Sequence, residues 1–140
     1  MSGSATPRKR VPKPPTILVD RCLSGRFDRA IRVLGCPTLS LEHAFSGRSE
    51  DVEDVEWIRL AGENGWLCLT QNPRIWGVKH EREAILEYKT RVFSLARGTY
   101  LADSQGVLFG RRWLSIVRRG ARPEPCFWTI SGEGVVKQLT

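Results

Sequence analysis

Short apolar runs alternate with segments of helical periodicity along most of the chain. Unbroken apolar runs are typical of buried strands, and apolar residues three and four apart among charges predict amphipathic helices. The predicted strands cover residues 16–19, 38–41 (a weak pattern), 66–70 and 91–95, followed by a hairpin of 127–130 and 135–139 around a glycine-bearing turn. The predicted helices run from near Ser24 to Gly35 and over residues 51–64, 81–88 and 102–119.

This order predicts an α/β fold with three layers, in which a mostly parallel central sheet is flanked by helices and a C-terminal β-hairpin lies at its edge. We expect one domain over residues 16–140, preceded by a disordered, basic, proline-rich arm over residues 1–15. In the last long helix, the apolar residues are expected on the buried side: Val107, Leu108, Trp113, Leu114, Ile116 and Val117.

The composition adds a charge balance that favours a polyanionic partner. Among 140 residues, 22 Lys and Arg face 15 Asp and Glu, which gives a formal net charge of +7. Four of the basic residues, Arg8, Lys9, Arg10 and Lys13, lie in the arm. Its composition leaves open whether the arm contacts phosphate or is a solvated tail.

The cysteines and the absence of long apolar segments indicate a reducing compartment. There is no C-x-x-C pair, and Cys36, Cys68 and Cys126 lie in or beside apolar runs, so they are predicted to be reduced core thiols. The chain shows neither a signal-peptide core near Met1 nor a run of membrane-spanning length. We therefore expect the protein in the cytoplasm.

The first candidate functional residue is Asp20, which directly follows the first strand. The carboxyl ends of parallel strands are where such sheets hold ligands. Asp20 could alternatively cap the helix that starts near Ser24. Thr70, Gln71 and Asn72 follow a neighbouring strand in the same way and are expected at the same edge.

A second candidate is the acidic start of the helix over residues 51–64. Five carboxylates lie within residues 50–56. The helix macrodipole, with Ser49 as N-cap, accounts for the first of them. Asp54 lies deeper, one turn before Ile58. If Asp54 and Asp20 converge, these two carboxylates suffice for a loose Mg²⁺ site that also uses water and substrate oxygens.

These motifs together resemble the PIN-like domains related to VapC-type toxins. The matching segments are ILVDRCL (17–23), DVEWI (54–58), GWLCLTQNPRI (65–75) and PCFW (125–128) with the closing hairpin. They are short, but they occur in the family's order and cover about residues 16–139. The resemblance implies a Mg²⁺- or Mn²⁺-dependent ribonuclease, often the toxin of a type II toxin–antitoxin pair.

The resemblance also implies the site residues. Asp20 matches the family's first acid and Asp54 its second, while Asn72 stands where a third acid is usual. An amide oxygen can bind Mg²⁺ but brings no charge, so metal affinity should fall. Glu81 and Glu83 could supply the missing charge, although the dipole of their helix also explains them. The best phosphate-binding candidates beside the site are Arg21, Arg74 and Lys79.

The sequence thus predicts an endoribonuclease with Asp20, Asp54 and Asn72 as catalytic residues and with Glu81 as a further metal ligand. Its expected partners are the RNA substrate, a cognate antitoxin and a second copy of the chain, with no membrane. The alternative is a PIN-like module with a degraded metal site that binds RNA or protein without cutting. A DNA-binding regulator is weaker, because no helix-turn-helix spacing is evident.

Overall fold

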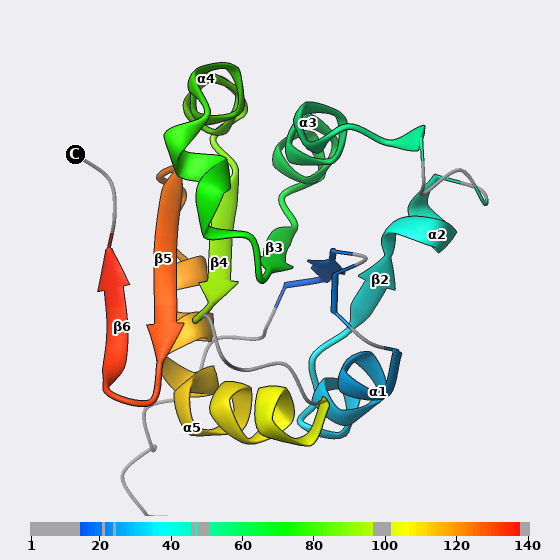
Figure 1. Cartoon of the computed structure of the whole chain (residues 1–140), viewed down its shortest axis with the longest axis vertical. Coiled ribbons are helices and arrows are strands. Elements are labelled where there is room, and N and C mark those ends of the chain that lie inside the picture. The colour runs from blue at the N-terminus through cyan, green and yellow to red at the C-terminus, as the bar shows by residue number, and fades with distance from the viewer. Residues whose placement is uncertain are drawn as a thin grey trace, which may run out of the picture.

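The structure is a computed structural model that describes residues 15–20, 22–23, 25–45, 47, 51–96 and 102–137 (Figure 1). In chain order its elements are β1 (Ile17–Val19), α1 (Gly25–Val33), β2 (Thr38–Ser40), α2 (Leu41–Ala44), α3 (Asp54–Asn64), β3 (Leu67–Thr70), the 3-10 helix η2 (Pro73–Gly77), α4 (Lys79–Tyr88), β4 (Arg91–Leu95), α5 (Ala102–Gly120), β5 (Cys126–Ser131) and β6 (Gly134–Lys137).

The sheet has six strands in the order β2-β1-β3-β4-β5-β6. The first five strands pair in parallel, and β6 pairs antiparallel with β5 through the register Ile130 to Val135. The predicted mostly parallel sheet with a hairpin at its edge is therefore confirmed. From β1 the strand order proceeds in opposite directions toward β2 and β3, so the ligand crevice of such a sheet is expected at the carboxyl ends of β1 and β3.

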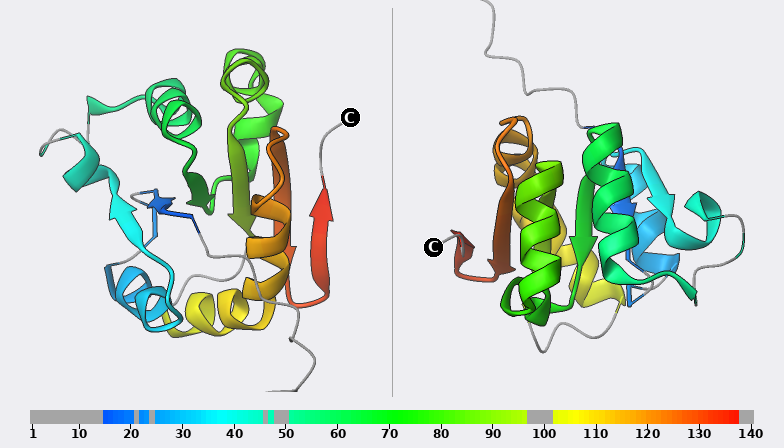
Figure 2. Two further views of the ribbon diagram at one scale, coloured as in Figure 1. Left: turned by 180° about the vertical axis from the view of Figure 1, so that it is seen from behind. Right: turned by 90° about the horizontal axis from the view of Figure 1, so that it is seen from above.

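Helices cover both faces of the sheet (Figures 1 and 2). One core lies between the sheet and the pair α1 and α5, and it includes Phe27, Phe93 and Phe109. The other core lies between the sheet and the pair α3 and α4, and it includes Trp57 and Phe127. Alternate residues of each strand enter opposite cores, as Leu67 and Cys68 do, because side chains of a strand alternate between its faces.

Two helix starts differ from the sequence-based expectation. Helix α3 begins at Asp54 rather than at residue 51, and its N-cap is Glu53 rather than Ser49. Val52, two residues before the helix, is buried in the core under α3, and Glu53 between them has an extended backbone, so the helical path begins only at Asp54. Helix α4 begins two residues earlier than expected, at Lys79.

The expected buried side of α5 is wrong at two positions. Leu108, Ile116 and Val117 are buried as predicted, but Val107 is 58% exposed and Leu114 is 40% exposed. Residues 107 and 114 are two full turns apart on the helix, so they lie on the same side of it, away from the core.

The remaining sequence predictions concern cysteines, the arm and the membrane. Cys36, Cys68 and Cys126 are free and buried, as expected for core thiols. The predicted arm, residues 1–15, lies outside the described residues except for its last residue. None of the helices in the described part of the chain is both long enough and apolar enough to cross a membrane.

Candidate active site

Asp20 lies where β1 ends, at the point where the strand order changes direction. Its backbone N–H donates a hydrogen bond to the carbonyl oxygen of Leu69 at 2.9 Å, which continues the β1–β3 pairing by one residue. The residue is only 9% exposed. The sheet therefore places the Asp20 carboxylate next to the end of β3, as the sequence predicted.

The Asp20 carboxylate is surrounded by hydrogen-bond donors. The Thr70 hydroxyl, at the end of β3, donates to Asp20 Oδ2 at 2.8 Å. The Cys22 thiol donates to the same oxygen at 3.5 Å. Donors of this kind stabilise the ionised carboxylate and fix its orientation. Cys22 is exposed as a residue, but its thiol lies against Asp20 and Thr70; loss of solvent around the thiol and the negative charge of Asp20 raise the pKa of Cys22 to about 11.

Asp54 is the first residue of α3, and it is held by the tryptophan one turn later. The indole N–H of Trp57 donates to Asp54 Oδ1 at 2.8 Å, while the Trp57 ring is fully buried in the core. Residues three apart on a helix lie on the same side, so this contact is local to α3. The hydrogen bond therefore orients the Asp54 carboxylate against a side chain that the core holds in place.

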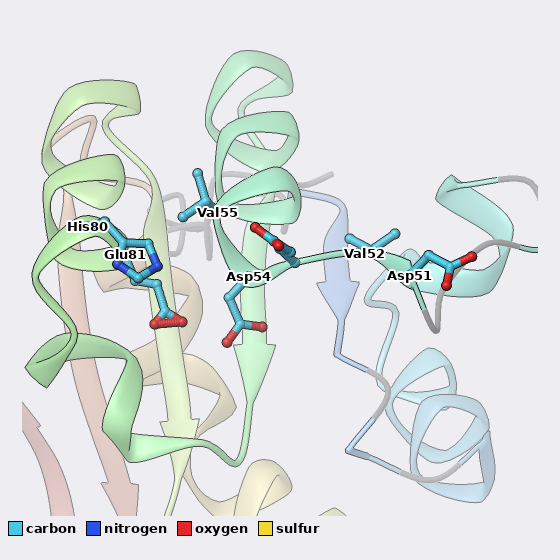
Figure 3. A pocket seen from close by; sticks show the side chains of 7 residues that line it. Asp51, Val52, Asp54, Val55, His80 and Glu81 are labelled. Carbon is cyan, nitrogen blue, oxygen red and sulfur yellow. The ribbon is translucent and has the colours of Figure 1, made fainter.

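Glu81, in the first turn of α4, faces Asp54 (Figure 3). The side chain of Glu81 is 8% exposed. Burial, the hydrogen bond to Asp54 and the negative charge of Asp54 raise the pKa of Glu81 from 4.5 to about 7. The raised pKa keeps Glu81 partly protonated near neutral pH, so its carboxyl group can donate a hydrogen bond to Asp54.

The packing of α3 against α4 brings these two carboxyl groups together. Both helices precede the strand they cover, so their N-termini lie at the carboxyl edge of the parallel sheet. Gly62 allows the close approach, because a Cβ there would collide with the backbone carbonyl of Tyr88 and the Thr90 hydroxyl. The two N-termini border an open cavity of about 400 Å³ that is lined by Asp51, Val52, Glu53, Asp54, Val55, His80 and Glu81.

Asn72, the residue at the place of a third acid, has a structural role in this arrangement. Its side-chain oxygen accepts a hydrogen bond from the backbone N–H of Arg74 at 3.1 Å and so caps η2. Its own N–H donates to the Thr70 hydroxyl at 3.1 Å. Asn72 is thereby linked through Thr70 to Asp20.

The residues proposed to hold phosphate are only partly described. Arg74 and Lys79 are exposed, at η2 and at the start of α4 respectively, and Arg21 lies outside the described residues. Trp76, which the sequence left open as a stacking residue, packs against the core next to Phe127, with the ring centroids 6.1 Å apart. Arg82 lies over its ring at 5.9 Å.

Comparison with known proteins now decides the family. The model of a family described as "PIN like domain" matches residues 15–97, which is more than half of the chain and includes both β1 and the α3–β3–α4 region. The chain belongs to the PIN-like domain family.

A relative within the curated proteins extends over more of the chain. It is a protein of Mycobacterium tuberculosis provisionally named ribonuclease VapC45. The two sequences are 26% identical over 125 residues, which cover 88% of this chain and 91% of the relative. No solved structure matches the chain.

In this PIN-like domain the expected site residues form two separate groups. Asp54 and Glu81 form one, and Asp20 with Thr70 and Cys22 forms the other. Across the part of the chain that the structure describes, no three His, Cys, Asp or Glu side chains converge closely enough to hold a metal ion. The arrangement therefore offers a two-carboxylate site at Asp54 and Glu81, with Asp20 outside it.

The donor set of this pair fits Mg²⁺ or Mn²⁺. Such ions are commonly bound by one or two carboxylates together with waters and substrate oxygens. Two carboxyl groups close enough to share a proton can instead share a cation, which compensates the same repulsion between their charges. The cavity beside them is open to solvent and has a volume of about 400 Å³, so there is room for waters.

Two contacts of this site were not foreseen from the sequence, and a third, Glu81 beside Asp54, was expected only as one of two alternatives, Glu81 or Glu83. The Trp57–Asp54 hydrogen bond has a local signal, since a donor three residues after a helical acid lies on its side of the helix. The contact of the Cys22 thiol with Asp20 has a weaker local signal, because the two residues are only two positions apart in the sequence. The approach of Glu81 to Asp54 has no local signal, because it depends on how α3 packs against α4.

Proposed function

We propose that this chain is a metal-dependent endoribonuclease and the toxin of a type II toxin–antitoxin pair. The observation that carries the proposal is the Asp54–Glu81 pair at the carboxyl edge of a PIN-like sheet, beside the edge position of Asp20. The name of the relative from Mycobacterium tuberculosis supports the same activity. The proposed setting is the cytoplasm, with RNA as substrate and a cognate antitoxin as inhibitor.

The proposed roles follow from the positions of the side chains. Asp54 and Glu81 would hold Mg²⁺ or Mn²⁺, and Trp57 keeps Asp54 turned toward the cavity. When bound, the ion would activate water and neutralise charge that develops on the phosphate. Asp20 adds a fixed negative charge at the same sheet edge, and Asn72 holds the loop that follows β3. Arg74 and Lys79 are exposed and are the proposed contacts to the RNA backbone.

The experiment is a cleavage assay of the full chain on structured RNAs with Mg²⁺ or Mn²⁺. We expect cleavage that is lost in Asp54→Ala, which removes a ligand of the proposed metal site, and in Asp20→Ala, which removes the negative charge beside that site at the same sheet edge. The Glu83→Ala variant is the matched control, since Glu83 is an exposed acid on α4 two residues from Glu81. Equal products from the wild type and both aspartate variants would mean a contaminating nuclease and would contradict the enzymatic proposal.

The second candidate is a PIN-like module that binds RNA or protein without cutting. Its support is Asn72, whose amide oxygen caps η2 in place of a third carboxylate. This candidate predicts RNA binding without metal-dependent products in the same assay.

A homodimer is also part of the proposal, and sedimentation of the isolated chain tests it; a monomer at roughly tens of micromolar would count against it.

A further inference from the structure

The two helical layers of this domain carry opposite charge. Helices α1 and α5 together contain seven arginines against Asp28 and Asp103. Helices α3 and α4 together contain six acidic residues against Arg59, Lys79 and Arg82. The excess positive charge of the domain's helices therefore lies in the α1 and α5 layer, on the face of the sheet opposite α3 and α4, the helices that carry Asp54 and Glu81 (Figure 2).

One side of α5 combines this charge with exposed apolar residues. The exposed positions of the helix repeat at spacings of three and four, and we call them the α5 stripe: Ser104, Val107, Arg111, Leu114 and Arg118. Val107 and Leu114 are among the few large hydrophobic residues that the described surface exposes. The spacing is that of the a and d positions with which helices pack against one another.

The other two arginines of α5 have structural partners and lie outside the stripe. Arg112 donates to the backbone carbonyls of Ser131 and Gly132 in the β5–β6 turn. Arg119 lies over the Trp128 ring, 4.0 Å from its centroid. Arg111 and Arg118, in contrast, are exposed between and after the two apolar residues. This division leaves the stripe as the part of the helix available to a partner.

We propose that the α5 stripe is the docking site for an acidic amphipathic helix of a partner protein. Leucine-like side chains of the partner would cover Val107 and Leu114, and its carboxylates would face Arg111 and Arg118. The helical spacing matches such a partner, and charge complementarity would select it over neutral helices.

Three other occupants of the stripe fit less well. A second copy would bring Arg111 and Arg118 toward their own counterparts, which is repulsive. The first fifteen residues of the chain hold four basic residues and no acidic one, so they too are repelled. A nucleic acid would match the arginines but not the exposed aliphatic side chains, since sequence-tolerant binding of single strands uses aromatic platforms.

The proposal does not depend on nuclease activity, because the stripe is on the face of the sheet opposite α3 and α4, the helices that carry Asp54 and Glu81. The probe is a fluorescent, stapled helical peptide of about 18 residues, long enough to remain helical, with leucines three and four apart flanked by glutamates. A second peptide carries lysine at every glutamate position. Fluorescence anisotropy with the full chain, in the absence of metal, measures binding.

We expect the acidic peptide to bind and the lysine peptide not to bind. Arg111→Glu and Leu114→Ser should each lower the affinity for the acidic peptide by about tenfold. The first variant reverses a charge that faces the peptide, and the second removes an apolar contact. Val107→Ser should act in the same direction. The matched control is Arg59→Glu, which makes the same change of charge at an exposed arginine of α3 and should leave binding unchanged.

Four results would overturn the proposal. One is equal loss of binding in Arg59→Glu and Arg111→Glu, which would show attraction to overall charge only. Another is unchanged binding in both serine variants. A third is that Arg111→Glu weakens the binding of a uridine oligonucleotide but not the binding of the acidic peptide, which would assign the stripe to RNA. The fourth is a dimer in sedimentation that Leu114→Ser disperses, which would assign it to a second copy.

Discussion

Asp20 and Asp54 are both aspartates at the carboxyl edge of one sheet, but their surroundings differ. Asp20 accepts hydrogen bonds from the Thr70 hydroxyl and the Cys22 thiol. Asp54 faces Glu81, whose pKa is raised to about 7. The first arrangement stabilises a fixed negative charge, while the second holds a proton that a cation can replace. The proposed exchange of a proton for a metal ion therefore belongs to the α3–α4 side of the edge.

The largest expected effect is on the pH dependence of stability. Glu81 has a pKa of about 7 in the folded protein against 4.5 for the ordinary side chain, so the folded state binds the extra proton. Its contribution is fully present below pH 4.5 and is lost as the pH rises to about 7. The loss amounts to at most about 3 kcal/mol. Urea unfolding of the wild type and Glu81→Gln between these pH values measures it.

The glutamine variant should show a flatter pH profile, since an amide carries no titrating proton. Asp20→Asn should keep the wild-type slope over the same range, because the Asp20 group does not include Glu81. If the free energy of unfolding varied with pH by the same slope in the wild type and in Glu81→Gln, the proton held by Glu81 would be contradicted. The proposed difference between the Asp20 group and the Asp54–Glu81 pair would then be lost.

Next in size is the effect of the indole that holds Asp54. Trp57→Phe keeps an aromatic ring in the core but removes the N–H that donates to Asp54. Residues that orient metal ligands typically change affinity by about 10- to 100-fold. We therefore expect Mn²⁺ affinity, measured by calorimetry, to fall by roughly that factor. Trp66→Phe is the control, at a half-buried tryptophan before β3; an equal loss there would point to general loosening.

A smaller effect is expected at Asn72, which belongs to the Asp20 side of the comparison. An aspartate can replace it as the cap of η2, so the fold should tolerate Asn72→Asp. The added charge should tighten Mn²⁺ binding by up to about tenfold if the site extends toward the end of β3. Unchanged affinity would place Asn72 outside the metal shell and would sharpen the separation of the two groups.

The smallest effect concerns the thiol beside Asp20. After burial, the charge of Asp20 is the next cause that raises the pKa of Cys22 to about 11. Asp20→Asn should therefore lower this pKa and raise the rate of Cys22 alkylation at mildly alkaline pH roughly threefold. Mass spectrometry of the labelled peptide measures the rate, with Cys36 as an internal reference. An unchanged rate would mean that burial alone controls the thiol.

Much of the fold follows from local patterns in the sequence. The runs that end at Val19, Thr70 and Leu95 are apolar on both faces, which identifies buried parallel strands, and Asp20 is placed at the sheet edge by chain position alone. The start of α3 is harder to predict from the sequence, because the burial of Val52 depends on tertiary packing. Val107 and Leu114 were assigned to the core because apolar character alone does not say which side of a long helix is covered.

The site was only partly predictable for the same reason. Chain position and motif point to Asp20, Asp54, Asn72 and Glu81, whereas the approach of Glu81 to Asp54 depends on how α3 packs against α4. The raised pKa of Glu81 results from that packing and has no counterpart in the spacing of residues along the chain.

The central claim is that a metal ion takes the place of the proton held between Asp54 and Glu81. The most direct test is calorimetry of Mn²⁺ binding near pH 6.5 in two buffers with different ionisation enthalpies, which counts the protons released. The account predicts release of roughly one proton from the wild type, because Glu81 titrates at about 7. It predicts release near zero, with weaker binding, from Glu81→Gln. Equal affinity and equal proton release in the two proteins would contradict it.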